Sequence, residues 1–158
     1  MSVASSLAQL FARDLARLAQ EIEAFPDDAA LWQAPAGITN TAGTLILHLE
    51  GNLREYVGRQ LGGMPYMRDR PREFSSRGVC REELLAKVEG LKDDIPSAIA
   101  QITDTQLEAE YPEAVLGRPW TVHQFLIHLY GHLNWHLGQI DAVRRVQTGQ
   151  GSIEFAQL

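Results

Sequence analysis

The stretch "TVHQFLIHLYGHLNWHLGQIDAVRRVQ", residues 121–147, has the apolar repeat of a long helix that begins at the capping residue Thr121. Three of the chain's five histidines, His128, His132 and His136, follow one another in it at intervals of four residues. Such an interval places side chains about 40° apart around a helix and about 6 Å apart along its axis. Two imidazoles at this spacing can bind one metal ion.

The histidine stripe is predicted to face the protein core, because Phe125, Ile140 and Val143 lie on the same side of the helix. His123, nine residues before His132, should point away. A single histidine on a buried face is more often hydrogen-bonded to a neighbour than bound to a metal. Each buried imidazole without a partner costs roughly 1–3 kcal/mol, however, and one ion can satisfy several. Three histidines on one stripe therefore favour a metal site.

Three further segments repeat apolar residues at intervals of three and four, which predicts helices over residues 3–25, about 39–62 and 80–99. Pro96 is expected to kink or break the third of them. Four amphipathic helices predict an all-α four-helix bundle, a single domain of residues 1–158 with a loose tail from about residue 149. Two charge pairs predict that the outer side of the second helix faces solvent: Glu50–Arg54 and Glu55–Arg59.

Two connections lack a clear period. Residues 62–79, "GGMPYMRDRPREFSSRGV", predict a long loop between the second and third helices, either functional or a crossover. Its apolar residues Met64, Tyr66 and Met67 could roof a metal pocket or could be ordinary loop residues. Residues 103–119 predict a short hairpin or an irregular loop.

His48 is the only histidine in the first 120 residues, and it lies on an apolar face in the middle of the second helix. If the second and last helices are neighbours, His48 can complete a three-histidine site. Asn52 and Tyr56 follow one and two turns later on the same side and could orient a ligand. Gln139, three residues after His136, could hydrogen-bond to that histidine. Each of the three could equally be a polar residue bonded to a neighbour inside the bundle.

Two other metal motifs are excluded by spacing. Zinc proteases need a glutamate directly after the first histidine, where "HLNWH" and "HLYGH" have leucine. Di-iron bundles need a glutamate three residues before a histidine, and none of the five histidines has one. A haem held by two histidines is the remaining alternative, although nothing else in the sequence indicates a porphyrin.

Composition narrows the class of protein. Of the 158 residues, 45% are hydrophobic and 22% charged, which is ordinary for a globular protein. The net charge is −6, and the sequence has no basic stripe of the kind that binds nucleic acid. No run approaches the roughly 18 apolar residues of a membrane span, and the N-terminus lacks the pattern of a signal peptide. Cys80 is the only cysteine, so no disulfide can form within the chain. We therefore predict a cytoplasmic protein that binds neither nucleic acid nor membrane.

The pair "LILHLEGNL" and "HLYGHLNWHLGQI" resembles the DinB-like superfamily of bacterial metal-binding four-helix bundles, over nearly the whole chain. The most specific part is His-x-x-x-His followed by Gly-Gln-Ile. The resemblance implies that His48, His132 and His136 bind a divalent metal, and that His128 lies beside the site without binding the ion. Leu137 departs from the pattern, since members often have arginine there.

The resemblance also implies a range of functions. Some members transfer small thiols such as bacillithiol or mycothiol, or isomerise substrates with thiol help, others are induced by DNA damage, and many have no known activity. Three neutral nitrogens suit Zn²⁺ or Ni²⁺ with an open position, where a water or thiol would be ionised. We therefore expect a metal-dependent enzyme, a thiol S-transferase or a hydrolase, acting on a small-molecule substrate such as a low-molecular-weight thiol. The alternatives are a non-catalytic metal-binding or stress-response protein, and a bundle whose histidines are only hydrogen-bonded.

The resemblance further implies a homodimer. The N-terminal helix could supply one face of it through Ala4, Ala8, Leu15 and Ala19. The same four residues could instead pack inside the bundle. Sedimentation of the purified protein distinguishes a dimer from a monomer.

Overall fold

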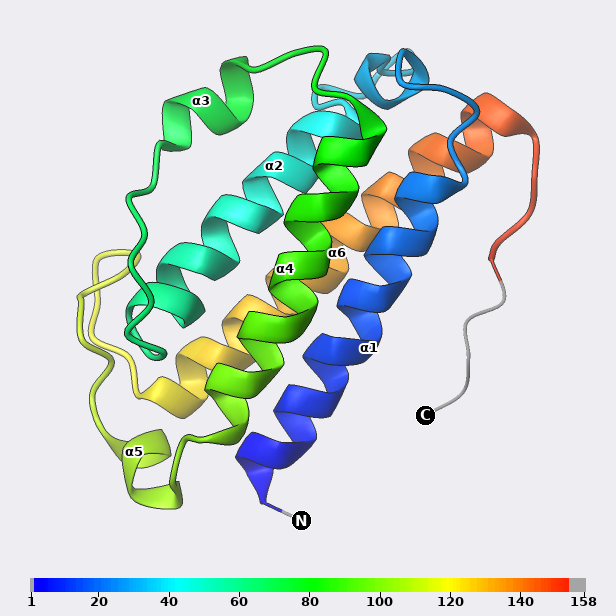
Figure 1. Cartoon of the computed structure of the whole chain (residues 1–158). Coiled ribbons are helices and arrows are strands. Elements are labelled where there is room, and N and C mark those ends of the chain that lie inside the picture. The colour runs from blue at the N-terminus through cyan, green and yellow to red at the C-terminus, as the bar shows by residue number, and fades with distance from the viewer. Residues whose placement is uncertain (1, 154–158) are drawn as a thin grey trace.

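The computed structural model describes residues 2–153, and helices dominate it (Figure 1). The four long helices are α1 (Val3–Glu23), α2 (Ala42–Leu53), α4 (Arg81–Ala100) and α6 (Val122–Thr148). The short elements are the 3₁₀ turn η1 (Ala30–Trp32), the π-helical segment η2 (Arg54–Arg59), α3 (Arg70–Ser75) and α5 (Asp104–Glu108). Within residues 2–153 there are only isolated β-bridges and no strand, so the prediction of an all-α fold is confirmed.

The long helices form a bundle in which α1 packs on α4 and α6, and α2 packs on α4 and α6. Figure 1 shows that α1 and α6 run in one direction while α2 and α4 run in the other. Because α2 and α4 are parallel, the chain between them must return along the whole bundle. The contact between α2 and α6 meets the condition under which His48 can lie beside the histidines of the last helix.

The helix ends follow local chemistry. The Thr121 hydroxyl accepts a hydrogen bond from the Gln124 amide at 3.2 Å, and the Gln124 side chain accepts one from the Thr121 amide, which is a capping box. At the other end of α6, Gly149 adopts a left-handed conformation with φ 68°. Contrary to expectation, Pro96 does not break α4, which continues to Ala100. Ala98 and Ile99, in the turn after Pro96, are buried in the core.

Helix α2 is buried on every side, from Ala42 to Leu53. The predicted solvent-facing side is therefore wrong: Glu50 pairs with Arg54, at 2.7 Å, but is only 9% exposed. The covering element is α3, which packs on α2 and lies within the predicted loop of residues 62–79. Asp69 caps α3 by accepting a hydrogen bond from the Arg72 amide at 3.1 Å. The helix is only six residues long, so apolar periodicity in the sequence does not reveal it.

The other predicted connection, residues 103–119, contains a short helix followed by a turn that is closed by an isolated β-bridge. Residues 104–108 form α5, and a bridge pairs Glu110 with Thr121 across the following turn. Beyond α6, the tail remains close to the bundle as far as Gly151, whose carbonyl accepts a bond from Arg144 at 3.2 Å. The rest of the predicted loose tail, residues 154–158, lies outside the described residues.

The core is lined by the apolar stripes of all four long helices. The four N-terminal residues that could have formed a dimer face are buried in it: Ala4, Ala8, Leu15 and Ala19. They pack against other helices of the same chain, so a homodimer would need another surface. None of the described helices is both long and apolar enough to cross a membrane.

Candidate metal centre

Three histidines from two helices meet at the interface of α2 and α6. His48 Nε2 lies 3.2 Å from His132 Nε2, and His136 Nε2 also lies 3.2 Å from His132 Nε2. One ring nitrogen from each of the three residues lies within 4.8 Å of the other two. His132 is therefore the middle member of the cluster, and the interval of four residues brings His136 to the same point.

The separation of these nitrogens fits a small cation. Tetrahedral zinc with bonds of 2.0–2.1 Å requires ligand nitrogens roughly 3.3 Å apart, which is close to the two distances of 3.2 Å. The nitrogens converge on one point, whereas the two axial ligands of a haem oppose each other across the ring. The arrangement therefore favours a single ion over the haem alternative.

The hydrogen bonds at the outer ring nitrogens fix the tautomers of two histidines. His48 Nδ1 donates to Glu73 Oε2 at 2.9 Å, and His136 Nδ1 donates to Gln139 Oε1 at 2.7 Å. In neutral rings, both Nε2 atoms then carry lone pairs that face His132 Nε2. His132 can donate one proton to one of them, so at least one pair of nitrogens is left without a hydrogen. With the His132 proton on Nδ1 instead, all three Nε2 atoms carry lone pairs, and one metal ion would satisfy them at once.

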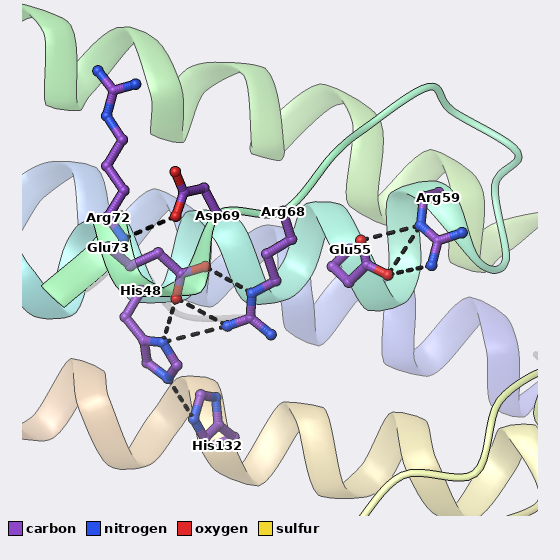
Figure 2. A network of polar contacts seen from close by, with 8 residues as sticks. All are labelled: His48, Glu55, Arg59, Arg68, Asp69, Arg72, Glu73 and His132. Carbon is purple, nitrogen blue, oxygen red and sulfur yellow. Dashed lines mark hydrogen bonds and ion pairs between the residues drawn. The ribbon is translucent and has the colours of Figure 1, made fainter.

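Glu73 is the site residue that the sequence analysis missed. It comes from α3 and is 7% exposed, and Arg68 holds its carboxylate through Nε at 2.6 Å and Nη2 at 2.9 Å (Figure 2). A side chain at Gly51 would overlap the Glu73 carboxylate, so glycine allows α3 to approach α2 this closely. A carboxylate behind a histidine orients the ring and raises its basicity towards a metal.

The signal for Glu73 was present but local. Asp69 followed by a proline at the start of a helix and a glutamate in its first turn is typical of a helix N-terminus. Nothing in that pattern says that α3 lies on α2. The predicted roof of Met64, Tyr66 and Met67 is in the same connection, but it is Arg68 and Glu73 that reach the histidines.

Burial and the neighbouring histidines disfavour protonation of His132 and His136. Burial, together with the neighbouring histidines, lowers the pKa of His132 from 6.5 to about 4. Burial also lowers the pKa of His136, although the bond to Gln139 opposes this. For Glu73, burial acts to raise the pKa, but the hydrogen bonds from His48 and Arg68 outweigh it and lower the pKa. At neutral pH His132 and His136 thus offer neutral imidazoles, which is the protonation state that a metal requires.

These shifts predict the pH dependence of stability in the metal-free protein. The pKa of His132 is about 4 in the folded chain and about 6.5 in an unfolded one, so the unfolded state binds more protons between these values. The free energy of unfolding should therefore fall as the pH drops from about 6.5 towards about 4. Urea unfolding of H132Q at several pH values should show a shallower fall than the wild type. H123Q, on the same helix, should keep the wild-type slope, and an identical slope in all three proteins would contradict the assignment.

The other four residues predicted for the site, which are Asn52, Tyr56, His128 and Gln139, differ in how far they are buried. Asn52 is buried, and its Oδ1 has no hydrogen-bond partner among residues 2–153. The Tyr56 ring packs edge-on against Phe125 at 5.3 Å. His128 is exposed and stacks on the Phe125 ring at 5.7 Å, and its own ring nitrogens are not part of the three-histidine cluster. Gln139 is exposed and holds His136.

The orientation of the histidine stripe differs from the prediction. His132 and His136 are half-buried and His128 is exposed, so the stripe lies at the edge of the interface between α2 and α6 and not in the core. Leucines occupy the core-facing side of α6 at this level, among them Leu129 and Leu133. The edge position leaves the cluster reachable from solvent. His123 lies apart from it, beside α5, as expected.

Comparison with known proteins agrees with this architecture. Residues 10–140 match the family model described as the DinB superfamily. A DinB-like protein from Bacillus cereus ATCC 10987 is 19% identical, with a TM-score of 0.71 over 93% of this chain and 95% of that chain. A DinB-like protein from Bacillus subtilis is 17% identical, with a TM-score of 0.71 over 95% of this chain and 96% of that one. No curated protein matches the chain.

Proposed function

Because this chain belongs to the DinB superfamily, we propose that His48, His132 and His136 hold one divalent metal ion and that the protein is a metal-dependent enzyme acting on a small molecule. The convergence of three ring nitrogens carries the proposal: the Nε2 atoms of His48 and His136 each lie 3.2 Å from that of His132. The expected reaction is the transfer of a thiol to its substrate, or a hydrolysis.

The donor set supports Zn²⁺ or Ni²⁺. Three neutral imidazoles suit both ions, and carboxylate-rich sites suit Mg²⁺ or Ca²⁺ better. When bound with three protein ligands, such an ion retains an open position and lowers the pKa of a water or thiol placed there. The half-buried position of His132 and His136 supports access for a small molecule from solvent.

The chain's own residues have positioning roles in this proposal. Glu73 and Gln139 hold the rings of His48 and His136 with their Nε2 atoms towards the common point. Asn52, in α2, and Tyr56, in η2, follow His48 along the chain and are available to orient a substrate. We propose a cytoplasmic location, because the only cysteine is exposed and unpaired and thus requires no oxidising compartment.

The substitution E73Q should weaken zinc binding by about 10–100-fold, the usual effect of losing a partner that orients a ligand. Glutamine can still accept the bond from His48, but it lacks the charge that makes the ring more basic, and it leaves the positive charge of Arg68 without its carboxylate. Competition with a chromophoric zinc chelator measures the change. E83Q is the matched control, since the Glu83 side chain is 59% exposed and its nearest ion pair is 3.9 Å long. Equal zinc affinity in both variants would remove Glu73 from the site.

A thiol titration tests the enzymatic part of the proposal. Cobalt-substituted protein should develop a thiolate-to-cobalt charge-transfer band when bacillithiol, mycothiol or glutathione is added at millimolar concentration. H132A treated in the same way should show no band. If the protein binds cobalt stoichiometrically but no thiol perturbs the spectrum, thiol transfer is rejected in favour of a hydrolase or a non-catalytic metal-binding protein.

A further inference from the structure

Arg68 uses only part of its guanidinium to hold Glu73. Nε and Nη2 donate to the two carboxylate oxygens, and Nη2 also lies 3.5 Å from His48 Nδ1. Figure 2 shows the third nitrogen, Nη1, directed away from Glu73. Among residues 2–153, Nη1 has no hydrogen-bond partner, while the side chain as a whole is only 11% exposed. A guanidinium held this firmly retains a free edge with hydrogen-bond donors.

The guanidinium that carries this free edge lies against His48, one of the three clustered histidines. The contact with His48 places Arg68 directly behind one of the three histidines, and its guanidinium carbon lies 5.4 Å from the centre of the Tyr56 ring. The Tyr56 ring in turn contacts Phe125 on α6. The arginine is therefore held between a carboxylate on one side and an aromatic surface on the other, which leaves little freedom to its charged group.

Asn52 adds an independent observation. It lies on α2 one turn from His48, is 7% exposed, and its buried Oδ1 accepts no hydrogen bond from the described part of the chain. A buried carbonyl without a donor costs free energy, so natural proteins usually supply a partner. A ligand that brings an N–H or O–H group would do so.

We propose that Arg68 binds a carboxylate of the small molecule that acts at this site, with Tyr56 as an apolar wall and Asn52 accepting a hydrogen bond from a neighbouring donor group of the same molecule. The inference deepens the proposed function by naming a substrate class. A planar carboxylate matches the parallel N–H groups along one guanidinium edge.

The charges nearby favour a singly charged carboxylate over a phosphate. The two arginines that immediately precede Arg68 along the chain are already paired: Arg54 with Glu50 and Asp94, and Arg59 with Glu55 and Glu113. Of the next two that follow, Arg70 lies over the Phe74 ring at 5.1 Å, and Figure 2 shows the Arg72 side chain extending away from Arg68. Arg68 itself is neutralised in part by Glu73. One guanidinium edge thus supplies the donors, which is enough for one negative charge but little for two.

The test compares benzoate with benzamide, which have the same shape but differ in charge. Two-dimensional NMR titrations of the metal-free protein and of the zinc-loaded protein give the dissociation constants. In both forms benzoate should bind at least about tenfold more tightly than benzamide, as expected for a charge-assisted hydrogen bond. The preference should be lost in R68Q and in R68K, because lysine keeps the charge without the planar edge. R59Q, whose side chain lies in η2 and pairs with Glu55 and Glu113, should retain it.

The outcomes separate this inference from the metal proposal. A preference that survives in R68K or R68Q, or that is missing from the wild type, overturns the role of Arg68 even if zinc binds stoichiometrically. A preference that depends on Arg68 in the metal-free protein supports the inference even if zinc fails to bind, and in that case the proposed metal function falls alone.

Discussion

H132A is expected to abolish stoichiometric metal binding, while H128A should reduce the affinity by about tenfold or less. His132 is the middle ligand of the cluster, with Nε2 3.2 Å from the Nε2 atoms of both His48 and His136. Structural zinc sites gain about 10–16 kcal/mol from about four ligands, so one ligand contributes roughly 3 kcal/mol, which is more than 100-fold in affinity. His128 lies outside the cluster and stacks on Phe125.

Metal analysis of protein purified without a polyhistidine tag measures this effect directly. The wild type should hold about one Zn²⁺ or Ni²⁺ per chain after reconstitution, and circular dichroism should show that both variants remain folded. Metal content below about 0.1 per wild-type chain would reject the metal site. If H128A loses the metal and H136A retains it, the site must instead lie one turn earlier on α6.

R144M should destabilise the fold by roughly 3–5 kcal/mol, the usual cost of leaving a buried charge without its partner. Arg144 is 1% exposed and Glu21 is 0% exposed, and the pair joins α6 to α1 through a 2.5 Å contact. The same guanidinium bonds Asp141 at 2.9 Å and the Gly151 carbonyl at 3.2 Å. Loss of the guanidinium therefore leaves the buried carboxylate of Glu21 without its partner and removes the hydrogen bonds to Asp141 and Gly151. Denaturation in urea measures the change.

Two further proteins test the cause of this loss. R145M alters the adjacent arginine, which is 50% exposed and lies 3.6 Å from Asp141, and should stay within about 0.5 kcal/mol of the wild type. The double variant E21L/R144M removes both buried charges and should be far more stable than R144M alone, because a packed apolar pair often replaces a buried ion pair without loss. If the double variant is as unstable as R144M, the loss in the free energy of unfolding comes from packing and not from the unpaired charge.

The interval of four residues between His132 and His136, and the capping box at Thr121, were accessible from sequence because both depend on the geometry of a single helix. The same local reasoning identified His48 as the third member, once helix α2 was assumed to lie beside α6. It also identified Gln139, which bonds His136 in the structure. Of these features, only the inclusion of His48 needed an assumption about how the helices pack, and the contact between α2 and α6 meets it.

The edge position of the histidine stripe, by contrast, could not be obtained from periodicity. Apolar spacing says which residues share a face of α6, and leucines and histidines lie close enough around the helix to share one broad side. The rotation of α6 against α2 then decided that Leu129 and Leu133 enter the core while His132 stays half-buried. That rotation is set by packing against α1 and α2, which are distant from α6 in the sequence.

What the sequence by itself determined was the set of helices and the histidines they carry, because helical periodicity and caps act over a few residues. Only the tertiary structure decided that Glu73 and Arg68 stand behind His48. Residues 62–79 lack a repeat that could reveal their partner, and they are laid over α2 because two parallel helices require the chain to return along the bundle. Gly51 leaves room for that approach. The contact from Glu73 to His48 spans 25 residues, and such a contact follows from the path of the chain in space.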